Sequence, residues 1–540
     1  MAKKIFTILA VVFLLMSVIG CKPAQQATEQ VQPTAAEPTK AAEPTKAAEP
    51  TKTAEPTKPQ APAEAVTLDY YIVGAGDTPE RPLVEEAINA YIEPLIGAKV
   101  VFHIIGWADW ATKSVTGMEA GEKRDIFFTA DWYFYMQLAS EGLFTPLNDD
   151  KGPNGNLLQK YGQGILSSLN PAFISGSQID GVNYAVPTNK ELSVPWGFVY
   201  NATLADEIGF TDAEAAKVKS FKDLEPWVAK AKAAHPDIYP YLTDGGSVGF
   251  MQWVHSFASN VDDYVLSMKA APEADGKWDE TIVSPIQTDW MKDYLATMYD
   301  WNTKKYINPD AYLSTFNTSD SLNAGKFFIE PMPLKGNNIK AQELVIASGN
   351  PDLKLKEIYG MPKIVVSSDT GGSMLAIPKA SDHPVEAMKL LNLMHTDSKL
   401  INMMLYGVEG THWTLDPDGR VNVINDGWIK AHPGAWVWAD ITIQKVTNKE
   451  DPNKNKMLID YSKDALAHPS LGFRFRTEPV SAELTAITTA RDGMQRALMT
   501  GSVDPAVELP KYLQALKDAG LDKVKAELEK QYTEWTKTKS

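Results

Sequence analysis

The sequence contains a single cysteine, Cys21, and only eight histidines in 540 residues. One thiol cannot form a disulfide within the chain, and the histidines are too scattered to make a zinc site. Arginine is also scarce, with seven in the whole sequence. Guanidinium groups are the usual clamps for carboxylates and phosphates, so this scarcity disfavours a heavily charged ligand. The net charge of −16 disfavours nucleic acid and anionic lipid surfaces as partners.

The N-terminus has the order of a secretory signal peptide. Two lysines precede an almost wholly apolar run over 5–19, and a glycine separates that run from Cys21. The run is short for a transmembrane helix, and no second long apolar run occurs. The stretch VIGC over 18–21 resembles the lipobox of bacterial lipoproteins, whose cysteine is acylated. We therefore expect a signal peptide over 1–20 and a lipid anchor at Cys21. The alternative is a cysteine that serves only as a small hydrophobic residue.

Residues 21–65 are of low complexity. The tract EPTKAAEPTKAAEPTKTAEPTK starts at Glu37 and repeats with a period of six. It has too few apolar groups to form a core, and its recurring proline favours extended polyproline II. At about 3.1 Å per residue, such a tract reaches roughly 100 Å or more. We interpret it as a disordered stalk, and a partner-binding tract is the less favoured alternative.

The body begins with alternating strand and helix patterns. Strands rich in β-branched and aromatic residues are predicted over 66–74, 99–107 and 125–132. A helix start at Thr78 and Pro79 follows the first strand. This order indicates an open parallel sheet with helices on both faces. The α/β character continues, with extended chain predicted over 184–201, 360–368 and 372–379, and helices over 211–233, 382–405 and most of the last 65 residues.

The first three strands end in a similar set of side chains. Carboxylates and indoles follow them: Asp77, Trp107, Asp109, Asp131 and Trp132. In open α/β sheets, ligands bind at the carboxyl ends of the strands. An indole can cover the apolar face of a sugar ring while a carboxylate accepts hydrogen bonds from its hydroxyls, so the combination favours a carbohydrate. The alternative is structural, with the aspartates capping helices and the tryptophans buried in the core.

A second candidate stretch is YGVEGTHW over 406–413, just past the long predicted helix. It combines glycines with Glu409, His412 and Trp413, and the sequence favours a hinge turn and a ligand contact equally. Trp436 and Trp438 alternate as in a strand, so at most one of them faces a site.

Catalytic signatures are scarce. No His-Glu-x-x-His motif occurs, and LDPDGRVNV over 415–423 lacks the later ligands of a calcium loop, which predicts a hairpin turn there. We expect no catalytic residue, no cofactor and no metal. Paired carboxylates need no sequence motif, so an anchored glycoside hydrolase stays the alternative function.

Several longer stretches carry a resemblance to a known family. They are GWADW, DIFFTADWYFY, GMPKIVVSSDTGGSMLAIPKASDHPVEAMKLLNLM, YGVEGTHW and the tail with GFRFRTEPV and LKDAGLDKVKAELEKQYTEW. Together with the lipobox and the stalk, they resemble the solute-binding lipoproteins of ABC importers. The most similar group has an additional C-terminal domain of unknown function, and the resemblance covers 66–540. It implies a type II periplasmic-binding-protein-like fold, with two α/β lobes around a ligand cleft and a mostly helical C-terminal extension.

The resemblance also implies a domain organisation. The first lobe spans 66–190 and returns over 369–410. The second lobe begins with 191–368, and 411–540 holds its return together with the helical C-terminal region. The connecting segments fall near 188–194, 366–370 and 409–413.

The leading hypothesis is a monomeric, membrane-anchored extracellular receptor. It captures a neutral oligosaccharide, closes its lobes and delivers the ligand to the transmembrane subunits of an ABC permease, without enzymatic activity. A neutral ligand is favoured over a uronate because no arginine occurs in 71–77, 106–113, 129–135 or 406–413. A peptide or another solute is the alternative ligand. The residues expected to contact the ligand are Asp77, Trp107, Asp109, Asp131, Trp132, Trp196, Trp253, Glu409, His412, Trp413 and Trp436.

Overall fold

The computed structural model describes residues 65–243, 265–269, 271–313, 318–360 and 362–539. The predicted signal peptide, Cys21, almost all of the stalk and the candidate Trp253 lie outside these ranges. The described residues belong to one unit, Pro62–Ser540. Within them, no helix has the length and apolarity needed to cross a membrane.

The first sheet has five strands in the order β2-β1-β3-β9-β4. They are β1 (Val66–Gly74), β2 (Ala98–Gly106), β3 (Ile126–Thr129), β4 (Ala185–Pro187) and β9 (Met374–Ala376). β1 pairs in parallel with β2 and β3, as the alternating strand and helix pattern predicts. β9 is antiparallel to β3 and β4, so the sheet is mixed rather than wholly parallel.

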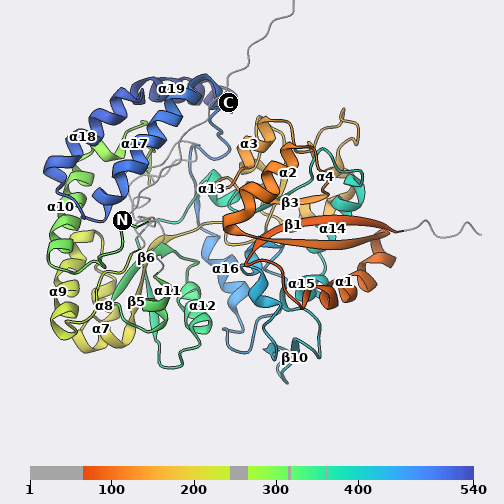
Figure 1. The fold of residues 1–540 in the computed structure, drawn as a ribbon, viewed down its shortest axis with the longest axis horizontal. Helices are drawn as coiled ribbons and strands as arrows, with labels where there is room; N and C mark the ends of the chain where they lie inside the picture. Colours follow the sequence, from red (N-terminus) through yellow and green to blue (C-terminus); the bar gives the residue numbers. More distant parts are fainter. Residues whose placement is uncertain (1–64, 244–264, 270, 314–317, 361, 540) are drawn as a thin grey trace, which may run out of the picture. The chain divides into compact units, whose positions relative to one another are not determined.

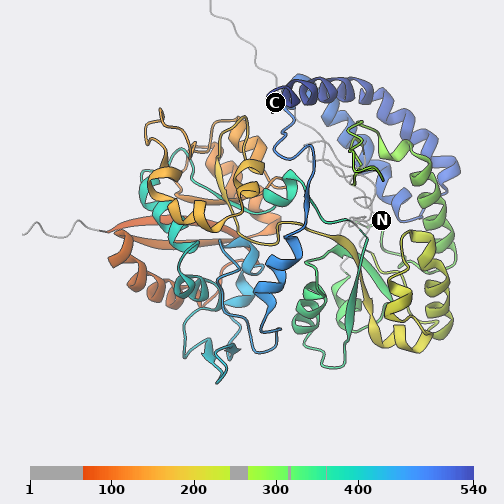
Figure 2. The same cartoon turned by 180° about the vertical axis from the view of Figure 1, so that it is seen from behind.

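Short helices and two longer ones cover this sheet. They are α1 (Arg81–Ile96), α2 (Thr116–Glu119), α3 (Tyr135–Ser140), α4 (Leu157–Tyr161), α5 (Gln163–Ser168), α6 (Pro171–Gly176), α14 (Pro384–Met394) and α15 (Ser398–Tyr406). α1 and α15 lie on one side of the sheet, and α2 and α3 lie on the other (Figures 1 and 2). The single long helix predicted over 382–405 is two helices, because the Asp397 side chain caps a new helix by accepting from the backbone N–H groups of Lys399 and Leu400.

The second sheet is smaller and antiparallel. Its strands are β5 (Trp196–Asn201), β6 (Ile329–Pro333) and β7 (Leu355–Tyr359), in the order β6-β5-β7. The helices in this part of the chain are α7 (Ala202–Ile208), α8 (Asp212–Ala215), α9 (Glu225–Ala234), α10 (Asp289–Thr303), α11 (Ser319–Asn323) and α12 (Ile339–Ser348). The helix predicted over 211–233 is thus divided between α8 and α9, with a 3-10 turn, Phe221–Leu224, before α9.

The chain between the second sheet and β9 is less regular than predicted. Of the strand expected over 360–368, only β8 (Ile364–Val365) forms, and it pairs in parallel with β12 (Leu466–Ala467). The short helix α13 (Ser367–Thr370) follows, because the Asp369 carboxylate accepts from the Val366 backbone N–H at 2.9 Å and closes a turn. Extended chain is therefore replaced by a turn just before β9.

The last part of the chain is helical, as the sequence predicts. A hairpin of β10 (Trp413–Leu415) and β11 (Val421–Val423) precedes α16 (Lys454–Ser462). The hairpin confirms the turn predicted within 415–423. Three long helices then follow: α17 (Ser481–Met499), α18 (Pro505–Asp518) and α19 (Leu521–Thr536). They pack on one another and α17 and α18 also contact α10.

The buried apolar residues form two large, separate cores, one in each lobe. The first core draws its buried residues from 68–186 and 374–439, and the second from 198–358 and 473–532. The expected return to the second lobe at 411 differs from this packing, because Trp413, Trp428 and Trp438 are buried in the first core. The buried residues of the first core run on to Ala439, whereas Ile441 packs with Ile339 and Leu458.

Candidate ligand-binding site

Three tryptophans gather beside the carboxyl ends of β2 and β3. Trp107 stacks on Trp132 with ring centroids 5.9 Å apart, and on Trp436 at 6.2 Å. Trp132 and Trp436 are 6.3 Å apart. Trp107 is 40% exposed and Trp132 is 52% exposed, which is unusual for side chains of this size. We call these three residues the indole platform, and its members come from three separate sequence-predicted positions.

A tight turn after β3 presents Trp132. The backbone N–H of Tyr133 donates to the Ala130 carbonyl at 2.8 Å, and Tyr135 N–H donates to the same oxygen at 3.2 Å. Phe134 takes a left-handed conformation with a φ of 66°, which a bulky residue rarely adopts. Such strain persists only where the surroundings impose it, and it is frequent at binding sites. The turn therefore holds the Trp132 indole on the surface.

The platform is tied to the segment before β9. The Trp132 indole N–H donates to the Gly372 carbonyl at 2.8 Å, and the Ser373 hydroxyl donates to the Trp436 carbonyl at 2.7 Å. The Tyr133 hydroxyl donates to the Trp107 carbonyl at 3.2 Å. Tyr133 also lies 5.5 Å from the Trp107 ring, so it supports the platform, although the sequence did not single it out.

Two cavities adjoin the platform. A cavity of about 980 Å³ has Trp132 on one side and residues of the C-terminal region, among them Phe475, Arg476 and Arg491, on the other. A cavity of about 680 Å³ has Trp436 in its wall, together with Lys335, Lys340 and Glu343 near and on α12. Both volumes are in the range of small-molecule sites. The indoles thus line two spaces that could receive a ligand.

The second cavity contains a network of charges. The Glu343 carboxylate accepts from Lys335 at 2.9 Å and from Lys454 at 3.0 Å. Burial would raise the pKa of Glu343, but the two ammonium groups outweigh it and lower the pKa to about 2. Lys340 has no ion-pair partner among the described residues, and burial followed by repulsion from Lys335 lowers its pKa. The sequence did not indicate this network, because Lys335, Lys340 and Glu343 form no recognisable motif and Lys454 is more than a hundred residues away.

Asp131 does not face the solvent. Its Oδ2 atom accepts from Arg474 Nη1 at 2.7 Å, and both side chains are below 10% exposed. Burial raises the pKa of Asp131, and Arg474 opposes that rise. The helix-capping alternative is not seen either, because Asp131 caps no helix. Asp131 is therefore one partner of a buried ion pair, next to Trp132.

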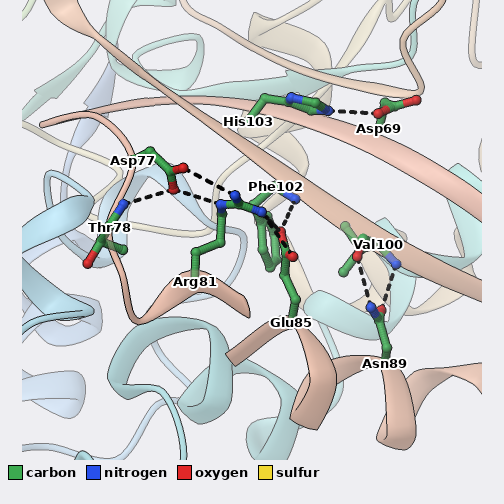
Figure 3. Close-up of polar contacts among 9 residues, drawn as sticks. All are labelled: Asp69, Asp77, Thr78, Arg81, Glu85, Asn89, Val100, Phe102 and His103. Carbon is green, nitrogen blue, oxygen red and sulfur yellow. Dashed lines mark hydrogen bonds and ion pairs between the residues drawn. The ribbon is translucent and has the colours of Figure 1, made fainter. Parts of the chain in front are cut away.

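Asp77 and Asp109 lie on the surface in local ion pairs. Figure 3 shows Asp77 directed at Arg81, whose Nε donates to it at 2.6 Å. That hydrogen bond lowers the pKa of Asp77, against a small opposing effect of burial. Arg81 also donates to Glu85 at 3.0 Å. Asp109 accepts from Lys113 at 2.8 Å and makes no capping bond. Of the two, Asp109 is closer in sequence to the platform, two residues after Trp107.

The stretch 406–413 is mostly packed. His412 is buried, accepts from the Val408 backbone N–H at 3.0 Å and contacts Glu80 at 3.1 Å. Trp413 is buried and donates to the Gly407 carbonyl at 3.0 Å. Glu409 is exposed. The buried His412 and Trp413 therefore fit the turn interpretation, and of the three candidates in this stretch only Glu409 is exposed and could contact a ligand.

The remaining candidate in the described residues is Trp196. It is half-buried on β5 and packs against Ile364 and Val366, apart from the indole platform. No group of three or more histidine, cysteine or acidic side chains in the described ranges could hold a metal ion. Among the described residues, the platform and its two cavities are accordingly the features that could contact a ligand, and the buried Asp131–Arg474 pair lies next to Trp132.

Comparison with known proteins gives consistent matches. Residues 78–398 match the bacterial extracellular solute-binding protein family, and residues 469–537 match a domain of unknown function, DUF3502. A carbohydrate ABC transporter substrate-binding protein of Streptococcus pneumoniae serotype 4 (strain TIGR4) is 28% identical over 474 residues, covering 86% of this chain and 90% of the relative.

Solved structures are similar over nearly the whole body. The N-glycan transport solute-binding protein NgtS of Streptococcus pneumoniae is 25% identical, with a TM-score of 0.74, covering 88% of this chain and 100% of that chain. The structure of NgtS in complex with Man5GlcNAc is 26% identical, with a TM-score of 0.68, covering 88% and 99%. The family match spans more than half of the chain, and the expected type II fold and C-terminal domain are confirmed. This chain belongs to the bacterial extracellular solute-binding protein family.

Proposed function

We propose that this protein is a membrane-anchored receptor that captures a neutral oligosaccharide outside the cytoplasm and delivers it to an ABC permease. The observation that carries the proposal is the indole platform of three partly exposed tryptophans, of which Trp132 and Trp436 are hydrogen-bonded to the segment before β9. Indole faces of this kind match the apolar faces of pyranose rings. The similarity to a carbohydrate ABC transporter substrate-binding protein and to the glycan-binding NgtS supports the same ligand class.

The charges around the platform favour a neutral ligand. Three arginines lie beside Trp132 or line the larger cavity, and each is paired with a carboxylate: Arg474 with Asp131, Arg476 with Asp180 and Arg491 with Asp492. A uronate chain would need several unpaired guanidinium groups for tight binding. Asp131 is also poorly placed to act in glycoside hydrolysis, because its side chain is only 9% exposed and is bound to Arg474. These facts argue for capture without chemistry.

Anchoring and delivery complete the proposal. Acylation of Cys21 would hold the body at the membrane on its proline-rich stalk, and the closed lobes would be the form that the permease subunits recognise. A monomer suffices for this cycle. Metabolic labelling with a palmitate analogue tests the anchor, and a Cys21→Ala variant that stays labelled and membrane-bound would refute it.

The test of ligand class is a thermal-shift screen of the secreted body against neutral oligosaccharides, uronate oligosaccharides and peptides, followed by calorimetry. We expect a neutral oligosaccharide to stabilise the protein. Trp107→Ala and Trp132→Ala should then weaken its binding about tenfold to a hundredfold, since aromatic stacking contributes roughly 1–3 kcal/mol. Trp227→Ala, a half-buried tryptophan on α9, is the matched control. Unchanged affinity in both platform variants would overturn the proposed function.

A paired titration tests ligand charge. Neutral and uronate oligosaccharides of equal length are compared at low and moderate salt. We expect the neutral series to bind more tightly at both salt concentrations. Tighter binding of uronates that is lost in an Arg476→Gln variant would move the site towards the C-terminal wall of the larger cavity.

A further inference from the structure

The stretch GFRFR, residues 472–476, has two chemically distinct sides. Phe473 and Phe475 are buried in the second core. Arg474 and Arg476 alternate with them and reach acidic residues of the first lobe, Asp131 and Asp180 respectively. Alternation with period two places the two kinds of side chain on opposite sides of an extended chain. This stretch, at the start of the C-terminal domain, therefore joins the second core to the first lobe.

Arg474 makes the deeper of the two connections. Its Nη1 donates to Asp131 Oδ2 at 2.7 Å, and its Nη2 donates to the Gly176 carbonyl, at the end of α6, at 2.5 Å. The side chains of Arg474 and Asp131 are 6% and 9% exposed. Removing one partner of such a buried pair leaves an uncompensated charge, which is strongly unfavourable. Two hydrogen bonds to the first lobe, one to Asp131 and one to the Gly176 carbonyl, thus fix the position of the Arg474 guanidinium.

Asp131 carries this constraint to the indole platform. Its backbone N–H donates to the Gly371 carbonyl at 2.8 Å, and the neighbouring Trp132 indole donates to the Gly372 carbonyl at 2.8 Å. A Cβ atom at Gly371 would lie 2.1 Å from Asp131 Oδ2, so the carboxylate occupies the space that a side chain there would need. The carboxylate, the two glycines and the indole consequently form one packed junction.

We propose that Arg474 is a positioning residue, which acts through Asp131 to hold Trp132 in the orientation that binds the ligand. The proposal rests on the proposed function, since it concerns the same platform. It gives the C-terminal domain a part in ligand binding, because the guanidinium that fixes the platform comes from that domain. Arg474 itself is not a ligand contact, because its two terminal nitrogens are engaged and its side chain is buried.

The experiment compares four variants of the secreted body. Arg474→Met removes the guanidinium, and Asp131→Asn with Arg474→Met removes both charges, so that no buried carboxylate is left unpaired. Arg474→Lys retains a cation. Lys123→Gln is the matched control, since Lys123 also pairs with an aspartate distant in sequence, Asp382, but on the exposed surface and outside both cavities. Thermal unfolding establishes that each variant folds.

Two readouts report on the platform. The first is the circular-dichroism signal of coupled indoles, to which the Trp132 contribution is assigned with a Trp132→Phe variant. The second is affinity for the neutral oligosaccharide that gives the largest thermal shift. In the charge-free double variant, we expect the signal of the coupled indoles to change as in Trp132→Phe, and affinity to fall about tenfold. Arg474→Lys should recover part of both, and Lys123→Gln should alter neither.

The outcomes separate this proposal from the proposed function. A folded double variant with an unchanged indole signal and unchanged affinity would overturn the positioning role alone. A changed indole signal in the double variant, with no oligosaccharide bound by the native protein, would support the junction and sink the proposed ligand class. If Arg474→Met alone does not fold, the double variant still decides, because its core contains no unpaired charge.

Discussion

Two regions of the first lobe have similar side chains but differ in how far those side chains are exposed to solvent. The indole platform and the stretch 406–413 both place tryptophan near carboxylates, at the end of a strand or a helix. At the platform the indoles stay exposed, whereas Trp413 and His412 are buried and bonded within the protein. In this protein, the indoles that stay accessible to a ligand are those that neighbouring groups hold outside the core.

The cause of the difference lies in where the hydrogen bonds go. At the platform, the Trp132 indole N–H donates to the carbonyl of Gly372, which is distant in sequence. This hydrogen bond supports the ring without covering it. In the stretch 406–413, the Trp413 N–H turns inward to Gly407, six residues back in the same turn. A local bond of this kind folds the indole against its own backbone and into the core.

The largest effect is expected from removing the buried indole. Trp413→Ala should lower the free energy of unfolding by about 3–5 kcal/mol, because it leaves a large cavity in the first core. Ligand affinity of the folded fraction should stay unchanged. Chemical denaturation and calorimetry measure the two quantities. A loss of affinity larger than that of Trp107→Ala would erase the distinction between the two regions.

A pH-dependent effect is expected beside the platform. His432 is buried, donates from Nε2 to the Leu405 carbonyl and accepts from the Gly434 N–H at Nδ1, so protonation at Nδ1 would oppose a donor. Burial lowers its pKa from 6.5 to about 4. The unfolded chain therefore takes up the proton first as pH falls, and stability decreases between about pH 7 and pH 4.

This loss should amount to about 3 kcal/mol over that interval. His432→Gln should remove it, and His235→Gln, a partly exposed histidine paired with Glu207, should not. Denaturation curves at several pH values give the difference between each variant and the native protein. Equal pH dependence in the His432 variant and the native protein would refute the assignment.

The smallest effect is expected at the rim of the platform. Asp109→Asn should change the free energy of unfolding by less than about 1 kcal/mol, because its partner Lys113 is an exposed neighbour one helical turn away. Its effect on oligosaccharide affinity should be smaller than that of Trp107→Ala. Lys113→Met is the control for loss of the ion pair. A larger effect of Asp109→Asn would assign the aspartate a direct hydrogen bond to the ligand.

The sequence predicted the fold well where patterns are local. β1 coincides with the predicted strand over 66–74, and the last part of the chain is mostly helical, as predicted. The platform was also predictable in part, because Trp107 and Trp132 follow strands whose carboxyl ends must meet at one edge. Trp436 could be named only as one of two alternating candidates, and the structure buries the other, Trp438.

The features that the sequence did not predict depend on contacts between residues far apart in the chain. Asp131 and Arg474 are 343 residues apart, and no local pattern indicates that they meet. The antiparallel β9 and the packing of Trp428 and Trp438 in the first core are likewise set by tertiary contacts. The expected limits of the lobes came from the family resemblance alone. The burial of Trp413, Trp428 and Trp438 in the first core could not be predicted from it.

The bonds of Asn189 bear on how the lobes can move. Its backbone N–H donates to the Ala439 carbonyl at 2.6 Å, its carbonyl accepts from Ile441 N–H at 3.0 Å, and its side-chain amide donates to Asp440 at 2.8 Å. These bonds hold the two segments side by side, so that neither can slide along the other without breaking them. In the domain organisation that the family resemblance implies, the segment around Asn189 connects the lobes. Such a paired ribbon resists shear and torsion more than it resists bending across its width. Opening and closing should therefore follow a single preferred swing, and the two walls of the cleft should return to the same register after each ligand is released.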